Sequence, residues 1–503
     1  MDMVRRALPP ANLPGAQQPT PLNLNRYALL FVYALQTFMT GCVYFGWAPL
    51  SAMLLKAQVF SFKCEANGKG GFVDDQRQLG HNYICDAQDA SVQSLFVFTL
   101  AVHCTMSALA GTMMDTLGPK ITSMIGQCFH IVAWSLISSL TAESHATVYL
   151  GFICIGLGAD TAFLPTLLVT RLFPGAAATV ITLIGSASSA SFAIPLILHS
   201  YLTDGGISGC WWYVGFGPCL FLVIVFLVMP LKAYKVYDGG MQENHMAFKP
   251  EEQNTGPKWA QPVEQHAGET TVESDSEAST KPRWSIEQPE ELVETATDYR
   301  FLKTLSSEKY ILIVIYFIAV GWITSFYQEG HDRILVQKAQ DFLGSALPFS
   351  FIPCIILGKL SEFLGIIPVM GIVNTAGLLA YAFSLKQAAT TGIISVLCFM
   401  VYMSLFVSQV FVYIESTFPA IYFGRLIGIV QLVGGLLSLF CSPLFHLTVG
   451  LGPKWLYLVQ LPLLGLLILM YFVLARMWWI RRKPLASQVS DAAHGSCNVT
   501  TEP

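Results

Sequence analysis

The feature that most restricts the fold of this chain is a series of long apolar runs with almost no charged residues. About twelve runs approach the roughly 20 residues that a helix needs to cross the hydrocarbon core of a bilayer. Only 12% of the 503 residues are charged, compared with about 25% in a typical soluble domain. Within lipid, only helices and closed barrels satisfy every backbone polar group, and these runs lack the alternation of barrel strands. The sequence therefore predicts an all-α membrane protein.

The apolar runs form two groups of six. In the first half of the chain they are Ala28 to Leu55, Ala90 to Met114, Ile121 to Ala142, Ala146 to Thr170, Leu172 to Thr203 and Gly205 to Leu231. In the second half they are Ile311 to Gln328, Phe342 to Gly358, Ile366 to Leu385, Gln387 to Ile414, Leu426 to Pro453 and Trp455 to Ala475. We therefore expect about twelve transmembrane helices in two six-helix bundles at 27–233 and 310–480, with one long outer loop at 56–90.

Three polar segments lie outside the expected bundles: a tail at 1–26, a linker at 234–309 and a tail at 481–503. The linker is rich in Glu, Gln, Ser, Thr and Pro, so we expect it to be disordered. Ser274 and Ser276 stand among acids in this linker. They are candidate phosphorylation sites, and a merely solvated acidic segment is the equally weighted alternative.

Basic residues near the ends of the runs indicate the orientation. They precede the first run and follow the last, and alternating spans place a further group on the same side, namely Lys120, Arg171, Lys232, Lys235, Lys359 and Arg425. By the positive-inside rule this side is the cytoplasm. We therefore expect a protein that is embedded in the lipid bilayer of the plasma membrane. Both of its termini are expected in the cytoplasm. The net charge of −4 gives no reason to expect a nucleic-acid partner.

A short glycine–acid–glycine pattern occurs once in each half. It consists of Gly111, Asp115 and Gly118 in the first half and of Gly358, Glu362 and Gly365 in the second, with identical spacing. Other residues match between the halves in the same order, among them the Phe-Pro pairs that end the fourth and tenth runs. The chain is therefore predicted to be a tandem duplication of a six-helix unit, an organisation typical of transporters.

These motifs resemble those of the major facilitator superfamily, and the resemblance covers nearly all of the runs. The first glycine pattern, which continues into Pro119 and Lys120, looks like the superfamily's loop between helices two and three. Gly46-Trp47 with the residues that follow, and the stretch from Ile184 to Ala190, are similar to the L-type facilitative and the apicomplexan amino-acid transporters of this superfamily. The resemblance implies two bundles that rock around a central site and an amino acid as substrate.

Two of the twelve cysteines, Cys64 and Cys85, lie in the expected outer loop, which faces an oxidising compartment. We expect a disulfide between them, and two unpaired thiols are the alternative.

Asp160 is the deepest ionisable residue, near the middle of the fourth run. An acid at this depth costs at least ~2.5 kcal/mol on insertion scales, so it must face the cavity or another helix. A counter-ion for a cationic substrate and a packing aspartate are equally weighted readings.

Tyr44 is expected in the wall of a substrate pocket, although aromatic residues of the membrane interface follow a similar pattern. Ser186 and Ser189 are candidates for binding a substrate carboxylate, against the more common role of close helix packing.

The repeated pattern predicts a gate at the cytoplasmic side. Asp115 and Glu362 are each expected to hold the N-terminus of a helix in the other half, near Arg425 for Asp115 and in the fifth span for Glu362. The glycines of the pattern permit the tight turns. Arg171 and Arg425 are further gate residues, with Glu415 beside one of them, whereas Glu329 is expected at a solvated outer edge.

The sequence thus predicts an amino-acid transporter that works by alternating access. Asp160 favours arginine or lysine, and large neutral or aromatic amino acids are the alternative. Uniport is expected over proton coupling because the first run contains no acid or histidine. The histidines of other runs, His103, His130 and His199, are expected to bond backbone carbonyls, with a proton relay as the alternative. A non-transporting receptor or scaffold is the alternative of another class. Enzyme activity is not expected, since no motif pairs a nucleophile with a base. Neither a cofactor nor a metal is expected, and the oligomeric state is open.

Overall fold

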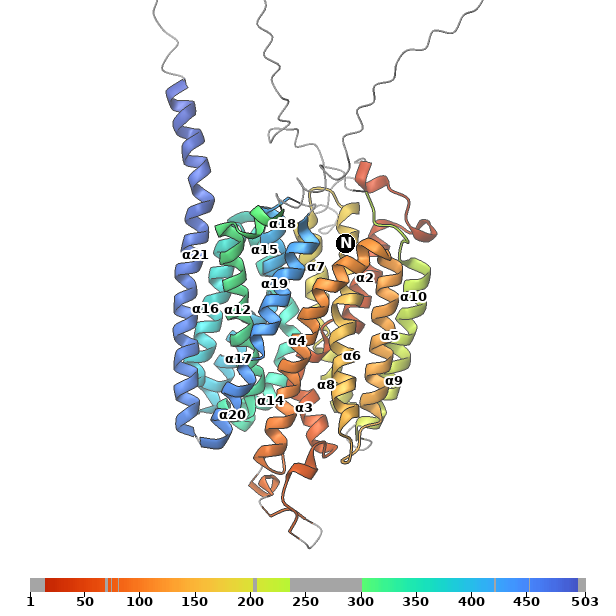
Figure 1. Ribbon diagram of the computed structural model, residues 1–503, viewed down its shortest axis with the longest axis vertical. Coiled ribbons are helices and arrows are strands. Elements are labelled where there is room, and N and C mark those ends of the chain that lie inside the picture. Colours follow the sequence, from red (N-terminus) through yellow and green to blue (C-terminus); the bar gives the residue numbers. More distant parts are fainter. Residues whose placement is uncertain are drawn as a thin grey trace, which may run out of the picture. The chain divides into compact units, whose positions relative to one another are not determined.

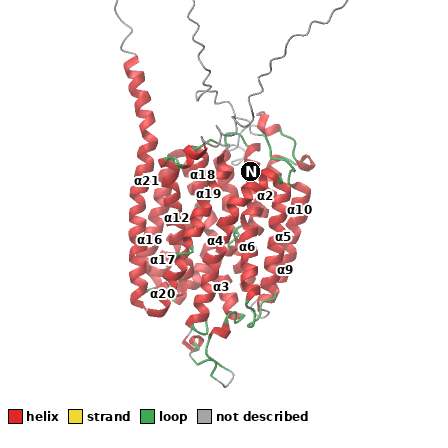
Figure 2. Ribbon diagram, viewed as in Figure 1, coloured by secondary structure: helices red, strands yellow, loops and turns green. Residues whose placement is uncertain are grey.

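The computed structural model describes residues 14–67, 71–73, 75–79, 81–201, 206–235, 301–419, 422–451 and 453–495. Over these residues the regular secondary structure consists of helices, which loops connect, and of one isolated bridge between Ala66 and Phe72 (Figures 1 and 2). Eleven described helices are long and apolar enough to cross a membrane. Large apolar side chains such as Phe216, Phe226 and Phe472 are exposed on the helix surfaces, as expected where lipid is the solvent. The predicted all-α membrane fold is confirmed.

The first half contains six spans, several of them made of two helices. The elements are α2 (Arg26–Thr40), α3 (Trp47–Lys56), α4 (Asp86–Thr116), α5 (Pro119–Ser138), α6 (Ala146–Phe163), α7 (Ala177–Ala190), α8 (Ala193–Tyr201), α9 (Cys210–Val214) and α10 (Leu220–Val228). A 3₁₀ segment, Leu164–Leu172, extends α6 from the point where Pro165 removes a backbone donor.

The second half repeats this arrangement. Its elements are α12 (Glu308–Glu329), α13 (His331–Ile334), α14 (Gln337–Ala346), α15 (Phe351–Leu364), α16 (Ile366–Ser384), α17 (Ala389–Ser404), α18 (Ser408–Thr417), α19 (Phe423–Ser438), α20 (Cys441–Leu451) and α21 (Pro453–Gly495). The last helix continues past 480, where the tail was expected to begin (Figure 1). Ser274 and Ser276 lie outside the described residues.

The first span is two helices and not one. A short 3₁₀ turn, Val43–Phe45, separates α2 from α3, with a glycine at each end. Gly46 lies so close to the carbonyl of Phe192, where the fifth span is itself interrupted, that a Cβ at this position would collide with it. Discontinuous helices that meet in this way are characteristic of substrate sites in transporters.

The two glycine–acid–glycine patterns form equivalent turns. Gly118 has φ +86° and precedes α5, and Gly365 has φ +81° and precedes α16. This left-handed region is open to glycine at little cost and is unfavourable for residues with a Cβ. The same conformation at both positions agrees with the predicted duplication.

The outer loop contains the predicted disulfide. Cys64 and Cys85 are bonded, with their Cα atoms 5.8 Å apart, and the bond connects the segment after α3 to the start of α4. Next to it, Arg77 binds Asp75 at 2.6 Å and lowers the pKa of this carboxyl.

We predict that non-reducing peptide mapping of the purified protein will recover Cys64 and Cys85 as one cross-linked species. The other described cysteines are free, and most are buried in helices. The buried ones should therefore react with alkylating reagents only after denaturation, whereas Cys128 is exposed on its helix surface. Alkylation of Cys64 and Cys85 in the native, unreduced protein would contradict the prediction.

Candidate functional site

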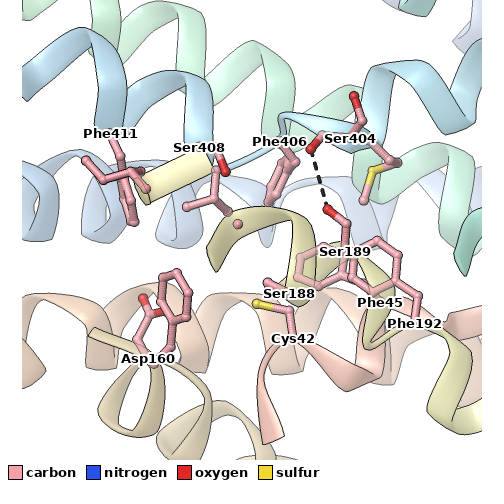
Figure 3. A pocket seen from close by; sticks show the side chains of 15 residues that line it. Cys42, Phe45, Asp160, Ser188, Ser189, Phe192, Ser404, Phe406, Ser408 and Phe411 are labelled. Atoms are coloured by element: carbon pink, nitrogen blue, oxygen red, sulfur yellow. Dashed lines mark hydrogen bonds between the residues drawn. The ribbon is translucent and has the colours of Figure 1, made fainter. Parts of the chain in front are cut away.

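A cavity of about 40 Å³ lies where the interrupted helices meet (Figure 3). Its wall comes from the break in the first span, from α6 and α7, and from the junction of α17 with α18. Most of the wall is apolar and aromatic, with residues such as Phe45, Phe192 and Phe411. A water molecule needs at least ~10–15 Å³ of such space. The cavity therefore holds a few waters in this conformation and must widen before it accepts an amino acid.

Asp160 lies in the wall of this cavity and is only 1% exposed. Among the residues that line the cavity, it is the only Asp, Glu, Lys or Arg. Its Oδ1 atom lies 2.9 Å from Nε2 of His103 on α4, and its Oδ2 atom accepts a 3.1 Å hydrogen bond from Nε2 of Gln431 on α19. The carboxylate is therefore held by helices of both halves.

Tyr44 does not line the cavity but lies behind Asp160. Its hydroxyl is 2.8 Å from Nδ1 of His103, so Tyr44, His103 and Asp160 form one buried chain of polar contacts. The sequence did not identify His103 as the partner of Asp160, and the expectation that it bonds a backbone carbonyl is wrong. Because the two residues belong to different helices, no local spacing relates them.

The serines of the fifth span have different environments. Ser189 lines the cavity, and its hydroxyl donates to the carbonyl of Ser404 across the two halves at 3.4 Å. Ser186 does not line the cavity and donates to the carbonyl of Leu183 in its own helix at 2.6 Å. A Cβ at Gly185 would collide with the hydroxyl of Ser408. Small residues therefore allow α7 and α18 to approach each other closely.

The second glycine pattern makes the contact that was predicted for it with the fifth span. Glu362 accepts a hydrogen bond from Thr179 on α7 and pairs with Lys359 on its own helix. One turn earlier, a Cβ at Gly358 would collide with the side chain of Thr182. Helices α15 and α7 are therefore packed directly on each other at the end of the bundle where sequence reasoning predicted a gate.

The first pattern faces the eleventh span. An added Cβ at Gly111 would lie 3.7 Å from the carbonyl oxygen of Gly424, immediately before Arg425 in α19. Asp115 is exposed and interacts electrostatically with Arg171. The guanidinium of Arg171 donates at 2.7 Å to the carbonyl of Tyr234.

The outer end of the bundle has a latch of its own, which sequence reasoning missed. Arg333 on α13 forms 2.8 Å ion pairs with Asp86 and Asp89 at the start of α4. Gln93, one turn further along α4, donates at 3.2 Å to Asp332. These contacts join the two halves on the side opposite to Glu362. Polar contacts therefore join the two halves at both ends of the bundle.

Glu329 and Glu415 differ in their environment. Glu329 is fully buried, and neither carboxylate oxygen has a hydrogen-bond partner in the described part of the chain, so the expectation of a solvated edge is wrong. It faces inward because it ends α12 one turn after Ser325, which is also buried. Glu415 is exposed near the end of α18.

We predict that the contact between Glu362 and Thr179 stabilises the inward-closed state. Glu362→Ala and Thr179→Val should each slow transport, by a few-fold, because a partly exposed hydrogen bond to a charged group contributes about 1 kcal/mol. The double variant should be no slower than either single variant, since both remove the same contact. Uptake rates per surface molecule measure these losses, and additive losses in the double variant would contradict a shared contact of Glu362 and Thr179.

Asp115→Asn should slow transport to a similar degree without loss of surface protein. Uptake rates per surface molecule measure this effect as well.

Relatives of this chain in sequence include proteins that are named as amino-acid transporters. "Amino acid transporter 6-1" of Toxoplasma gondii is 41% identical over 92% of this chain and 81% of its own length. "Arginine transporter 1" of the same organism is 37% identical over 96% of this chain and 94% of its own. A more distant relative, "Aromatic and large neutral amino acid transporter 5-3" of Toxoplasma gondii, is 30% identical over 85% and 79%.

The fold also occurs in solved transporter structures. The human organic anion transporter MFSD10 (TETRAN) superposes with a TM-score of 0.56 over 89% of this chain and 99% of its own, at 12% identity. At this identity the likeness concerns the fold alone. The sequence profile of the Major Facilitator Superfamily matches residues 29–442. With its two glycine-hinged halves around one cavity, this chain belongs to the Major Facilitator Superfamily.

Proposed function

We propose that this chain transports amino acids by alternating access about the cavity at Asp160 and that it favours cationic amino acids. The observation that carries the proposal is the single carboxylate in the cavity wall. A charge buried in an apolar wall requires a partner of opposite charge, and the side chain of arginine or lysine supplies one. The name "Arginine transporter 1" agrees with this substrate class, whereas the name "Amino acid transporter 6-1" agrees with amino acids in general.

The transport cycle follows from the two latches. Release of Arg333 from Asp86 and Asp89 opens the outer side, and the substrate places its cationic group at Asp160. Release of Glu362 from Thr179 then opens the cytoplasmic side. Ser189 and the 3₁₀ turn that carries Phe45 lie where the rest of the substrate would be accommodated. We place the protein in the plasma membrane with both termini in the cytoplasm, and we propose facilitated uniport and no enzyme activity.

Uptake by the full-length protein in a heterologous cell tests the proposal. Radiolabelled arginine and lysine should enter faster than in control cells, and each should inhibit uptake of the other. Large neutral amino acids such as phenylalanine are the alternative substrates, because the cavity is lined by aromatic residues. Entry of these alone would replace the cationic class. If no amino acid enters while the protein is at the cell surface, a receptor or scaffold of this fold is the better description.

A further inference from the structure

His103, one of the two described partners of Asp160, gains a positive charge when it is protonated. His103 is 2% exposed, its Nε2 faces Asp160, and its Nδ1 faces the hydroxyl of Tyr44. A hydroxyl both donates and accepts, whereas neutral and protonated imidazole differ in whether Nδ1 carries a hydrogen. Rotation of the Tyr44 hydroxyl therefore keeps this hydrogen bond in either state. The 2.9 Å approach of Nε2 to Oδ1 is an ion-pair contact without hydrogen-bond geometry, so it depends on the charge of His103 more than on its direction.

We infer that His103 is a second selectivity residue of the site, because its proton and the cationic group of a substrate compete for Asp160. The inference rests on the function proposed above. Without substrate, the protonated imidazole is the counter-ion of the buried carboxylate. When a guanidinium or ammonium group reaches the carboxylate from the cavity, two cations would share one anion in a region of low dielectric. His103 then releases its proton to the water on the side that admitted the substrate.

Few other groups near the pair are able to take part. Its electrostatic contacts within the described chain involve Cys42, Tyr44, Cys104 and His130. Thiols and phenols ordinarily stay neutral between pH 5 and 7.5, whereas histidine titrates in this range. His130 on α5 is buried as well and interacts electrostatically with His103, whereas the described partners of Asp160 are His103 and Gln431. H130Q therefore tests whether the neighbouring histidine, and not His103, sets the pH dependence.

The direction of the pH dependence follows from the competition. Acidic pH favours the protonated imidazole, so the KM for arginine should rise as pH falls, by up to about tenfold per pH unit. A neutral isostere such as citrulline leaves the protonated pair in place, so its inhibition of uptake should not weaken in acid as arginine binding does. In acid the empty carrier returns with its proton, so the uniport proposed above gives way to an exchange of each entering arginine for one proton. The charge carried per arginine should then fall from about one toward zero.

The test measures arginine uptake and current at clamped voltage, at about pH 5.5 and about pH 8, for the full-length protein and for H103Q and H130Q. The glutamine of H103Q keeps a polar side chain at this position but takes up no proton. The parent and H130Q should show the rise in KM and the fall in charge per arginine, whereas both quantities should be independent of pH in H103Q. Surface labelling controls for expression.

Each outcome decides a separate point. Arginine uptake whose KM and charge ratio do not change with pH overturns the inference and leaves the proposed function intact. A pH dependence that persists in H103Q, or that vanishes in H130Q, overturns the assignment to His103. These two comparisons need a folded variant, whereas the pH dependence and the citrulline inhibition are measured on the parent protein. If the parent takes up neither arginine nor lysine at any pH, the proposed function fails and the inference fails with it.

Discussion

Asp160→Asn should abolish the uptake of arginine and lysine at low substrate concentration while the protein still reaches the cell surface. The asparagine side chain has the same shape, and its carbonyl oxygen still accepts the hydrogen bond from Gln431. What is lost is the single carboxylate of the cavity wall. A buried charge deprived of its partner costs about 3–5 kcal/mol, which corresponds to a loss of affinity by a factor of a few hundred or more. Concentration series of labelled arginine measure this loss.

Asp75→Asn is the matched control, because it removes an equal charge from the outer loop, where Asp75 pairs only locally with Arg77. Its uptake should be close to that of the parent. If the parent carries arginine and Asp160→Asn carries it equally well, Asp160 is a packing residue that holds α4, α6 and α19 together. If arginine and lysine neither enter the parent nor compete, a neutral substrate takes their place.

Gly358→Ala should slow transport strongly although it adds only a methyl group. The new Cβ would lie 2.8 Å from Cβ and 2.9 Å from Oγ1 of Thr182, and still closer to its methyl group. Such distances force α15 away from α7, and overpacking of this kind costs about 1–3 kcal/mol. The inward-closed state would then be disfavoured by roughly 5- to 150-fold relative to the open one. Uptake per surface molecule, together with cysteine accessibility from the cytoplasmic side, reports the shift.

Removal of the facing side chain from the other helix should restore function. In Gly358→Ala combined with Thr182→Gly the collision is relieved, so transport should recover toward that of the parent. Gly371→Ala is the control, because a Cβ at this glycine of α16 meets open space. A loss in Gly371→Ala as large as that in Gly358→Ala would show that any added methyl group in these helices impairs the protein. Close packing of α15 on α7 would then not be the cause.

The residues of the candidate site were identifiable from the sequence to different degrees. Asp160 stood out because an acid deep in a membrane span is costly and therefore needs a reason to be there. Tyr44 was expected to face the substrate, whereas the structure places its hydroxyl on His103. The outer latch of Arg333 with Asp86 and Asp89 was not anticipated, because charges near a helix end are usually solvated. Glu329 was misplaced for the same reason.

The sequence by itself determined the helical class, the duplication, the two glycine turns and the disulfide. Each of these depends on local physics, namely the length of an apolar run, the repetition of a pattern, the conformational freedom of glycine and the compartment of a loop. Only the tertiary structure decided which side chains meet. Asp160 contacts His103 from α4 and Gln431 from α19, residues far from it along the chain. Contacts of this kind arise when whole helices pack, because each helix surface offers several polar groups and the packing angle selects one. The periodicity of a single span therefore predicts which residues avoid lipid, and the packing of the bundle determines their partners.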